Sequence, residues 1–243
     1  MIVAIPAVEK DDGWTDLHLL LHSLDAYASE TIPVVTWKGD HEPIVRSARV
    51  VLIRQPDDAA HFGDACRFLI EQTSDADLLF LNDDCVVMPS TMSLLQDDLL
   101  AIEELGVARL GLVGLRSNYV AGLQNIRRPA PRKDGKPSRF ANGIRYESED
   151  FLIATDAVFG VAFYAPRDAL RAVSDDWTRV HWWGDTLLSW DLAKLGYSHF
   201  VSRSYVHHHG SRSGGEEKWG QWDAEARVWI KAHRPEVAKA WGW

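Results

Sequence analysis

One stretch of this chain restricts its fold more than any other: a short apolar run that ends in three oxygen-bearing side chains. Leu78 to Leu81 is continuously apolar and short enough for a strand buried on both faces. Asn82-Asp83-Asp84 follows at once, and an apolar run resumes at Cys85. Polar side chains at the carboxyl end of a buried strand lie where open α/β sheets bind ligands. The stretch therefore predicts an α/β sheet with a ligand site at this strand end.

The oxygen atoms of this tripeptide suit hard divalent cations, Mg²⁺ or Mn²⁺, which keep waters and share the phosphates of a ligand. In an extended segment Asn82 and Asp84 point to one side and Asp83 to the other. One side would then face a metal-diphosphate. A polar turn without a ligand explains the same residues equally well, because Asn and Asp are common in turns. Both interpretations remain open on this stretch alone.

Apolar spacing along the first half of the chain alternates between strand and helix patterns. Such alternation is typical of a mostly parallel sheet with crossover helices, an αβα sandwich of the Rossmann-like kind. We expect Thr15 to cap the first helix. The expected strands are 2–8, 33–37, 50–53, 78–87 and 110–115, and the expected helices are 14–28, 62–73 and 89–105.

The second half begins with a basic loop and ends in an aromatic helix. Residues 116–150 hold no lasting period and many Arg and Lys, Arg116 among them, which favours either a phosphate clamp or a solvated loop. Residues 185–195 carry a helical pattern that Gly196 ends, with Asp185 at the helix start. A strand at 200–206 leads into three consecutive His residues. The Trp-rich tail, 217–243, has three open roles: a homodimer contact, a cover over the sheet, or a wall of the acceptor site.

Composition narrows the class of protein. The 243 residues show no repeat and no linker, so we expect one domain over 1–243. A net charge of −9 disfavours sequence-blind binding to nucleic acid phosphates. Cys66 and Cys85 give neither a disulfide framework nor zinc spacing, no apolar run reaches the ~18 residues of a membrane helix, and the first residues do not read as a signal peptide. We therefore expect no membrane span and a cytoplasmic location.

Four motifs together resemble the GT-A fold glycosyltransferases of the family 2-like kind. Each motif is permissive by itself, but their order and spacing span roughly residues 2–213. The helix beginning Phe62-Gly63-Asp64-Ala65-Cys66-Arg67 is similar to the one that packs beside the nucleotide in that family. The Asp-x-Asp-type motif is matched by 81–84, the later acidic motif by 184–196, and the His-Gly-Ser element by 205–213.

The chain departs from the family pattern at several positions. Gly184 stands where the family has Glu, Leu187 where it has a second Asp, and Asp191 where it has Arg. Asn82 replaces the first acid of the Asp-x-Asp motif. These departures leave the donor open and place the base assignment on one residue, Asp185.

The resemblance implies an inverting transfer from a nucleotide-diphosphate sugar, with a UDP-sugar favoured, to an acceptor hydroxyl. Asp185 would be the base, and we expect the helix dipole to keep it ionised by lowering its pKa. The divalent cation, Mn²⁺ or Mg²⁺, would be held by Asp84 with His207 or His209. For His208 we expect an ordinary hydrogen-bonded or solvated side chain.

The same resemblance divides the single domain into a nucleotide-sugar half, 1–88, an acceptor and catalytic half, 106–213, and a helical tail, 214–243. The expected acceptor is a glycan, a protein, a modified base or a small molecule. Expected donor-binding residues are Ile5, Pro6, Ala7, Arg67, Asn82, Asp83 and Arg212. Expected residues around the sugar and acceptor are Gly160, Trp182 and Trp183, although both Trp residues also suit a core.

Three other functions fit parts of the pattern. An inactive relative that only binds a sugar nucleotide or glycan is favoured by Asn82, Gly184 and Leu187. A nucleotidyltransferase needs a Gly-rich basic loop after the first strand, whereas residues 7–13 are acidic with one Gly. A metal-dependent hydrolase built on Asp84 and the His residues lacks a second ligand cluster.

Overall fold

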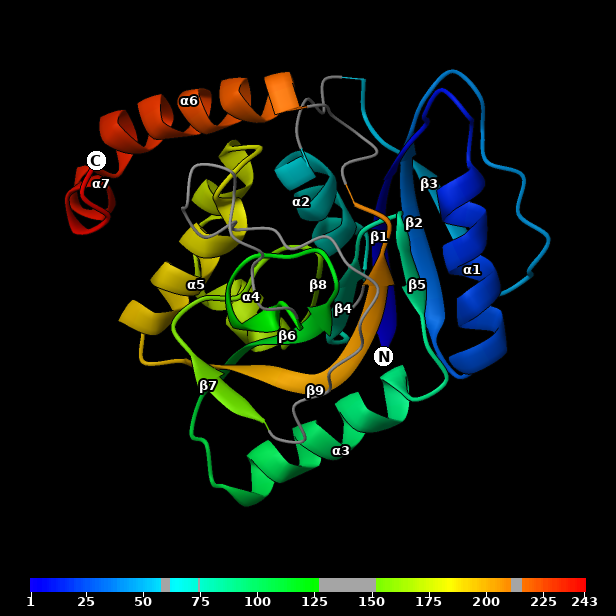
Figure 1. The fold of residues 1–243 in the computed structure, drawn as a ribbon, viewed down its shortest axis with the longest axis horizontal. Coiled ribbons are helices and arrows are strands. Elements are labelled where there is room, and N and C mark those ends of the chain that lie inside the picture. The colour runs from blue at the N-terminus through cyan, green and yellow to red at the C-terminus, as the bar shows by residue number, and fades with distance from the viewer. Residues whose placement is uncertain (58–61, 74, 127–151, 211–215) are drawn as a thin grey trace, which may run out of the picture.

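The fold is built on one sheet whose strands come from both halves of the chain (Figure 1). The structure is a computed structural model that describes residues 1–57, 62–73, 75–126, 152–210 and 216–243. The strands are β1 (Ile2–Val8), β2 (Ile32–Lys38), β3 (Val51–Arg54), β4 (Leu78–Leu81), β5 (Cys85–Val87), β6 (Leu110–Ser117), β7 (Ile153–Thr155), β8 (Ala162–Ala165) and β9 (Ser198–His208). The helices are α1 (Thr15–Tyr27), α2 (Phe62–Gln72), α3 (Thr91–Glu104), α4 (Arg167–Ala172), α5 (Gly184–Lys194), α6 (Glu216–His233) and α7 (Pro235–Ala240), with 3₁₀ turns η1 (Gly122–Gln124) and η2 (Asp175–Arg179).

The sheet is mostly parallel, as the alternating pattern predicts. Its order is β3-β2-β1-β4-β8-β6-β9-β5, and β7 pairs with β9. Strands β1 to β4, β6 and β9 run in one direction, while β5, β7 and β8 run against their neighbours. The expected strand 78–87 is in fact two strands, because a turn at 82–84 separates β4 from β5 and sends them to different neighbours.

Helices cover both faces of the sheet because side chains alternate along each strand. In β1, Val3 and Ile5 pack with α1 and α3 in one core, while Ala4 faces the other core. In β4, Leu79 joins the first core and Phe80 the second. The second core also holds apolar residues of α2, α4, α5 and the tail helices. The molecule is therefore a three-layer αβα sandwich.

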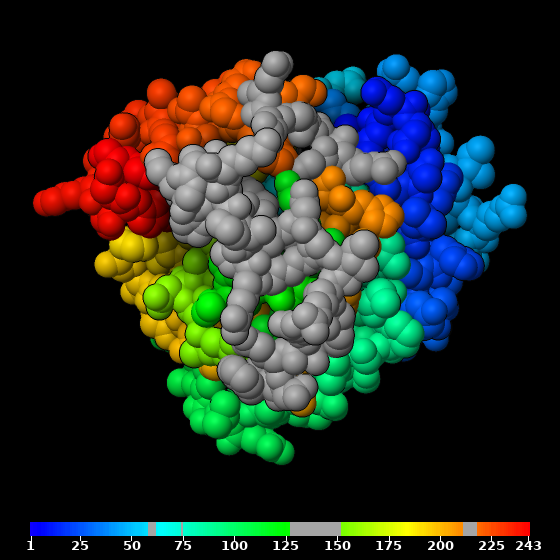
Figure 2. Space-filling view, viewed as in Figure 1, coloured from blue at the N-terminus to red at the C-terminus, as the bar shows by residue number. Residues whose placement is uncertain are grey.

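The tail helices α6 and α7 lie outside α5 and complete the second core. Ile230 of α6 and Val237 of α7 are fully buried there. Arg234, between the two helices, bonds both carboxylate oxygens of Asp191 on α5, at 2.5 and 3.0 Å. In the space-filling view these helices, in orange and red, flank the molecule opposite the N-terminal segment, in blue (Figure 2). The tail therefore packs on the helix layer that contains α5.

Two local expectations are corrected. Thr15 is the first residue of α1 and bonds the carbonyl of Asp12, whereas Trp14 occupies the cap position. Arg116 lies inside β6, is buried, and donates from Nε to the carbonyl of Ser202 at 3.1 Å. The rest of the basic loop, from residue 127 to 150, is outside the described residues. None of the described helices combines the length and apolarity that a membrane crossing requires.

Candidate functional site

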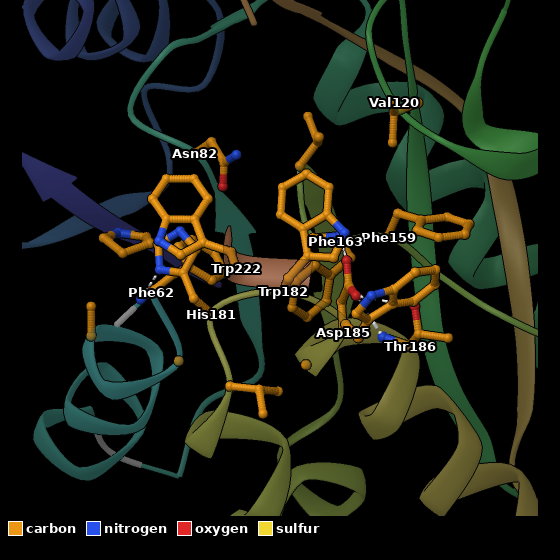
Figure 3. Close-up of a pocket in the computed structure, with 18 of the residues that line it drawn as sticks. Phe62, Asn82, Val120, Phe159, Phe163, His181, Trp182, Asp185, Thr186 and Trp222 are labelled. Atoms are coloured by element: carbon orange, nitrogen blue, oxygen red, sulfur yellow. Dashed lines mark hydrogen bonds between the residues drawn. The ribbon is translucent and has the colours of Figure 1, made fainter. Parts of the chain in front are cut away.

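A cavity of about 710 Å³ opens at the carboxyl ends of the parallel strands β1, β2 and β4. Pro6 and Val8 of β1, the turn 82–84 and the start of α5 line it. Figure 3 shows residues that line it: Asn82 and Trp222 lie toward one side, Asp185 and Phe159 toward the other, and Trp182 between them. Parallel strands that end together bring polar residues far apart in sequence to one crevice, which is where such sheets bind ligands.

The turn after β4 separates the three side chains of the Asn-Asp-Asp motif. The N–H of Cys85 bonds the carbonyl of Asn82 at 3.1 Å, so the segment is not extended and the expected sharing of one side by Asn82 and Asp84 does not follow. Asn82 lines the cavity, and its Oδ1 is buried with no hydrogen-bond partner among the described residues. A buried carbonyl oxygen without a donor is costly unless a ligand or ion satisfies it.

Asp83 belongs to a buried ionic cluster. Its Oδ2 accepts the N–H of Val8 at 3.2 Å, and its Oδ1 lies 3.0 Å from Nζ of Lys10. Lys10 also contacts Asp16 at 3.1 Å, and these side chains are 9% and 2% exposed. Burial raises the pKa of Asp83 to about 6 although Lys10 opposes the rise. The ammonium of Lys10 therefore ties the motif to the first strand and helix.

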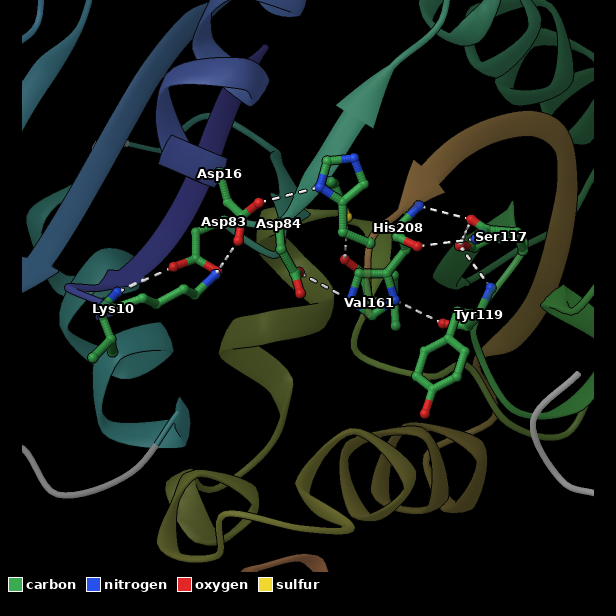
Figure 4. A network of polar contacts seen from close by, with 12 residues as sticks. Lys10, Asp16, Asp83, Asp84, Ser117, Tyr119, Val161 and His208 are labelled. Carbon is green, nitrogen blue, oxygen red and sulfur yellow. Dashed lines mark hydrogen bonds and ion pairs between the residues drawn. The ribbon is translucent and has the colours of Figure 1, made fainter. Parts of the chain in front are cut away.

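Asp84 forms a buried pair with the middle residue of the His triplet (Figure 4). Its Oδ1 lies 2.9 Å from Nε2 of His208, and Nδ1 of that ring lies 2.7 Å from the carbonyl of Tyr119. Nδ1 must donate to this carbonyl, which leaves Nε2 to face Asp84. Burial opposes charge on both groups, but their mutual attraction raises the pKa of His208 and, with Lys10, holds the pKa of Asp84 below its usual value.

The neighbouring His residues face other partners. Nδ1 of His209 lies 3.1 Å from Oδ1 of Asp16, and Nδ1 of His207 lies 3.3 Å from the hydroxyl of Tyr205. His208 is hydrogen-bonded, as we expect, but its partner is Asp84 itself. Side chains alternate between the two faces along a strand, so His208 points away from the side that its two neighbours share. Among the described residues no set of three or more His, Cys, Asp or Glu side chains is arranged to hold a metal ion.

Asp185 lies in the cavity wall at the start of α5, held by backbone donors. Gly160 N donates to its Oδ2 and Thr186 N to its Oδ1, both at 2.6 Å. Burial raises the pKa of Asp185, and these bonds offset part of the rise. The expected lowering by the helix dipole is therefore wrong in sign, since the loss of water around the carboxylate outweighs its N-terminal position.

The backbone before Asp185 is strained and tightly packed. Trp183 has φ +70°, the only positive φ outside glycine in the part of the chain described. Such a conformation is uncommon for a bulky residue and concentrates at functional sites. At Gly184 an added Cβ would lie 2.3 Å from the carbonyl of Trp177. This close approach leaves no room for a side chain at Gly184, where the resembled motif has Glu.

The other departures also have structural reasons. Leu187 is fully buried in the second core. An Asp at this position would place a carboxylate in an apolar environment, which is costly. Asp191, where the resembled motif has Arg, pairs with Arg234 of the tail. The tail and α5 thus fit each other through their charges.

Aromatic rings of α6 complete the cavity wall, which the helical pattern alone does not reveal. Trp219 and Trp222 line the cavity together with Trp182. Trp183 also lines it, but its Nε1 donates to Asp223 at 2.6 Å and its ring packs against Trp241 and Trp243 of the tail.

Several predicted donor-binding residues lie elsewhere. Ile5 and Ala7 point into the α1-side core because they alternate with Pro6 along β1. Arg67 lies on α2, is not part of the cavity lining, and approaches Asp64 at 3.8 Å. Arg212 is outside the described residues. Pro6, Asn82, Asp83, Asp84, Gly160, Trp182, Trp183 and Asp185 do line the cavity.

The fold is shared with solved structures, although the sequence matches no protein-family model and no curated protein. GalNAc-T7 with UDP, GalNAc and Mn²⁺ superposes with a TM-score of 0.59 and 13% identity, over 85% of this chain and 43% of that one. S. aureus TarS 1–349 superposes with a TM-score of 0.56 and 12% identity, over 95% and 66%. A second S. aureus TarS structure gives 0.54 and 13%, over 95% and 39%. The likeness at these identities shows the fold alone, and this protein has a GT-A-like fold.

Proposed function

We propose that this protein is an inverting glycosyltransferase that moves a sugar from a nucleotide-diphosphate sugar, with a UDP-sugar favoured, to an acceptor hydroxyl. One observation carries the proposal. Asp185 and Asp84 are 101 positions apart in the sequence (185 − 84), yet both line one cavity at the carboxyl ends of parallel strands, together with His208, the partner of Asp84. The fold agrees, since it is shared with the glycosyltransferases TarS and GalNAc-T7, the latter crystallised with UDP, GalNAc and Mn²⁺.

Asp185 suits the role of general base. The acceptor oxygen would attack the anomeric carbon while its proton passes to the carboxylate, and the bond from that carbon to the diphosphate would break with its electron pair leaving on the phosphate. The raised pKa makes Asp185 a stronger base than an exposed aspartate. Gly160 and Thr186 fix its orientation through their N–H groups, leaving further lone pairs for the acceptor.

The residues around Asn82 fit a divalent cation, Mn²⁺ or Mg²⁺. Asp84 supplies a carboxylate, His208 an imidazole nitrogen whose ring is oriented by Tyr119, and Asn82 a buried oxygen with no partner among the described residues. Few protein ligands are needed, because Mg²⁺-type sites share substrate phosphates and waters. Bound there, the cation would offset charge on the leaving diphosphate. We assign the imidazole ligand to His208 in place of His207 or His209, which face Tyr205 and Asp16.

A second candidate is a relative that binds a nucleotide-sugar or glycan without transfer. Both oxygens of Asp185 already accept short backbone hydrogen bonds, which is also what a purely structural carboxylate does. Asn82, which stands where the Asp-x-Asp motif has its first acid, also favours binding without transfer. Hydrolysis or transfer of the donor sugar separates this candidate from the enzyme.

The first test is thermal unfolding with UDP, GDP, TDP or CDP, each with and without Mn²⁺. A nucleotide at a hundredfold excess over its Kd stabilises the fold by ~2.7 kcal/mol, or about 5–10 °C in a chain of this size. We expect a shift with UDP that requires Mn²⁺ and disappears in Asp84→Ala. Asp97→Ala, on the exposed face of α3, is the control and should keep the shift.

The outcomes separate the candidates. No shift with any nucleotide, in a protein that unfolds cooperatively, would contradict both the transferase and the nucleotide-sugar-binding relative. A shift without any turnover of UDP-sugars would favour the relative. A shift that survives in Asp84→Ala would remove the metal assignment but not the nucleotide site.

A further inference from the structure

Three indoles form an array in the cavity, with the ring of Trp182 next to the other two. The Trp182 ring lies 6.2 Å from Trp219 at an interplanar angle of 34°, and 6.5 Å from Trp222 at 25°. The imidazole of His181 packs against Trp222, with ring centroids 3.9 Å apart and an interplanar angle of 31°. Two segments distant in sequence, the one before α5 and the first half of α6, therefore build a single aromatic wall.

This wall is distinct from the other tryptophans of the second half. Trp241 and Trp243 pack against Trp183, and the guanidinium of Arg227 lies 4.2 Å from the Trp243 ring, which fixes the tail to α5. None of Trp241, Trp243 and Arg227 lines the cavity, whereas Trp182, Trp219 and Trp222 all do. Trp241 and Trp243 thus hold the tail, Trp182, Trp219 and Trp222 face the cavity, and Trp183 does both.

The position of the array points to the acceptor. In Figure 3 Trp182 lies between Asn82 and Asp185, and Trp222 lies beyond it beside His181 and Phe62. Trp182 precedes Asp185 by three residues, across the strained Trp183. A ring that rests on Trp182 would therefore have its edge beside the proposed base.

We propose that Trp182, Trp219 and Trp222 are the acceptor subsite and that the acceptor is a saccharide, held by the C–H face of a pyranose ring. This inference rests on the proposed transferase function. A pyranose offers an apolar face of axial C–H groups for aromatic rings and hydroxyls around its rim, and the site offers both complements, indole faces and the Asp185 carboxylate.

A nucleobase acceptor also has a flat face but fits the molecule less well. A nucleic acid strand would bring phosphates to a chain with a net charge of −9, and Lys38 is the only Lys or Arg among the described residues that line the cavity. The saccharide assignment further means that α6 is part of the active site, so the tail both completes the second core and shapes the acceptor subsite.

The test is saturation-transfer NMR in the presence of UDP and Mn²⁺. The probes are methyl glycosides of glucose, galactose and N-acetylglucosamine, which carry no aromatic group, and thymidine and deoxycytidine as nucleobase probes. We expect saturation of the ring C–H protons of at least one pyranoside. Trp222→Leu and Trp182→Leu should each weaken that binding by about tenfold. Trp229→Leu, on the same helix but outside the cavity lining, should leave it unchanged.

Two readouts keep this inference separable from the function on which it rests. The UDP-dependent thermal shift and the slow hydrolysis of the donor by water, both independent of an acceptor, should survive in Trp222→Leu. If Trp222→Leu lost the thermal shift or the donor hydrolysis together with pyranoside binding, the array would belong to the donor site. That result would overturn the inference but not the proposed transferase function. Saturation of the nucleosides alone, or of no probe while UDP binds, would overturn the saccharide assignment. Trp182→Leu checks the result if Trp222→Leu does not fold.

Discussion

At Asp185 burial and backbone hydrogen bonds act in opposite directions on one carboxylate. Burial raises its pKa, and the N–H groups of Gly160 and Thr186 limit the rise. A base must be ionised, so kcat/KM of sugar transfer should fall as the pH is lowered. We expect the midpoint of this fall to lie above the ordinary aspartate pKa of about 3.9. Asp185→Asn should lower transfer by about 10²–10⁴ and keep the UDP-dependent thermal shift. An Asn variant with near-normal transfer would show that the carboxylate is structural.

Gly160 is the residue whose size protects this geometry. An added Cβ would lie 3.2 Å from Oδ2 of Asp185, tighter than ordinary contact, while the N–H would still bond the same oxygen. We expect Gly160→Ala to displace the carboxylate and lower kcat at least tenfold, a loss of ~1.4 kcal/mol in transition-state stabilisation. Steady-state kinetics with thermal unfolding measure the change.

The control for that variant is Gly220→Ala. Among the described residues, no atom beyond the adjacent helix backbone and the two chain neighbours lies within 4 Å of an added Cβ at Gly220. Gly220 is inside α6, where Ala is the better helix former by about 1 kcal/mol. It should keep kcat and gain stability. If Gly160→Ala lowered the free energy of unfolding but left kcat unchanged, the contact between Gly160 and Asp185 would stabilise the fold and would not contribute to catalysis.

Residues next to each other in sequence were easier to predict than residues brought together by the fold. Asn82, Asp84 and Asp185 carry visible local signals, a strand end and a helix start. Lys10 and His208 do not, because Lys10 meets Asp83 across 73 positions and the choice among three consecutive His residues depends on the register of β9. A single shift of that register would exchange their roles.

At the scale of elements, the long periodic segments are predictable and the short antiparallel strands are not. Strands β1, β2 and β6 and helices α1, α2, α3 and α5 follow the expected pattern closely. The strands β5, β7 and β8 have three or four residues each, too few to show a period, and their direction is set by pairing with β4 and β9. Tertiary pairing decides where local pattern is too short.

The junction of β9, β6 and α5 depends on one neutral imidazole. His199 accepts the N–H of Leu112 at Nδ1, 2.9 Å away, and its Nε2 lies 3.0 Å from the carbonyl of Ser189. Burial lowers the pKa of His199, although Ser189 and the charge of Asp156 oppose the change. Because the unfolded chain then takes up this proton more readily, His199 contributes stability that is present above about pH 6.5 and is lost as the pH falls below it.

His199→Asn makes this pH dependence measurable. The free energy of unfolding should be lower in the variant at pH 8, and the difference from the wild-type protein should shrink between pH 6.5 and pH 5, by up to ~1.4 kcal/mol per pH unit. Urea unfolding at each pH gives the two curves. His22→Asn, on the exposed face of α1, should run parallel to the wild type. A difference that stays constant with pH would mean that His199 acts only through its packing.

At the scale of the whole molecule, the two halves share one sheet and should unfold together. Strand β4 of the first half pairs with β8 of the second, and β5 pairs with β9. Nine of the eleven Trp residues lie after position 176, so tryptophan fluorescence mainly reports the second half. Leu24 of α1, in the opposite layer, is fully buried in the first core.

Leu24→Ala should therefore shift the fluorescence transition although no tail residue is changed. Removing this buried side chain costs about 2–5 kcal/mol through lost burial and a cavity, and in a cooperative unit every probe registers the same loss. We expect far-UV circular dichroism and fluorescence to give one common midpoint in urea, lowered equally by the mutation. Leu19→Ala, an exposed position on the same helix, is the control. A fluorescence midpoint that stays in place while circular dichroism moves would show that the halves fold separately, and the proposed active site would then lie between two independent units and not within one domain.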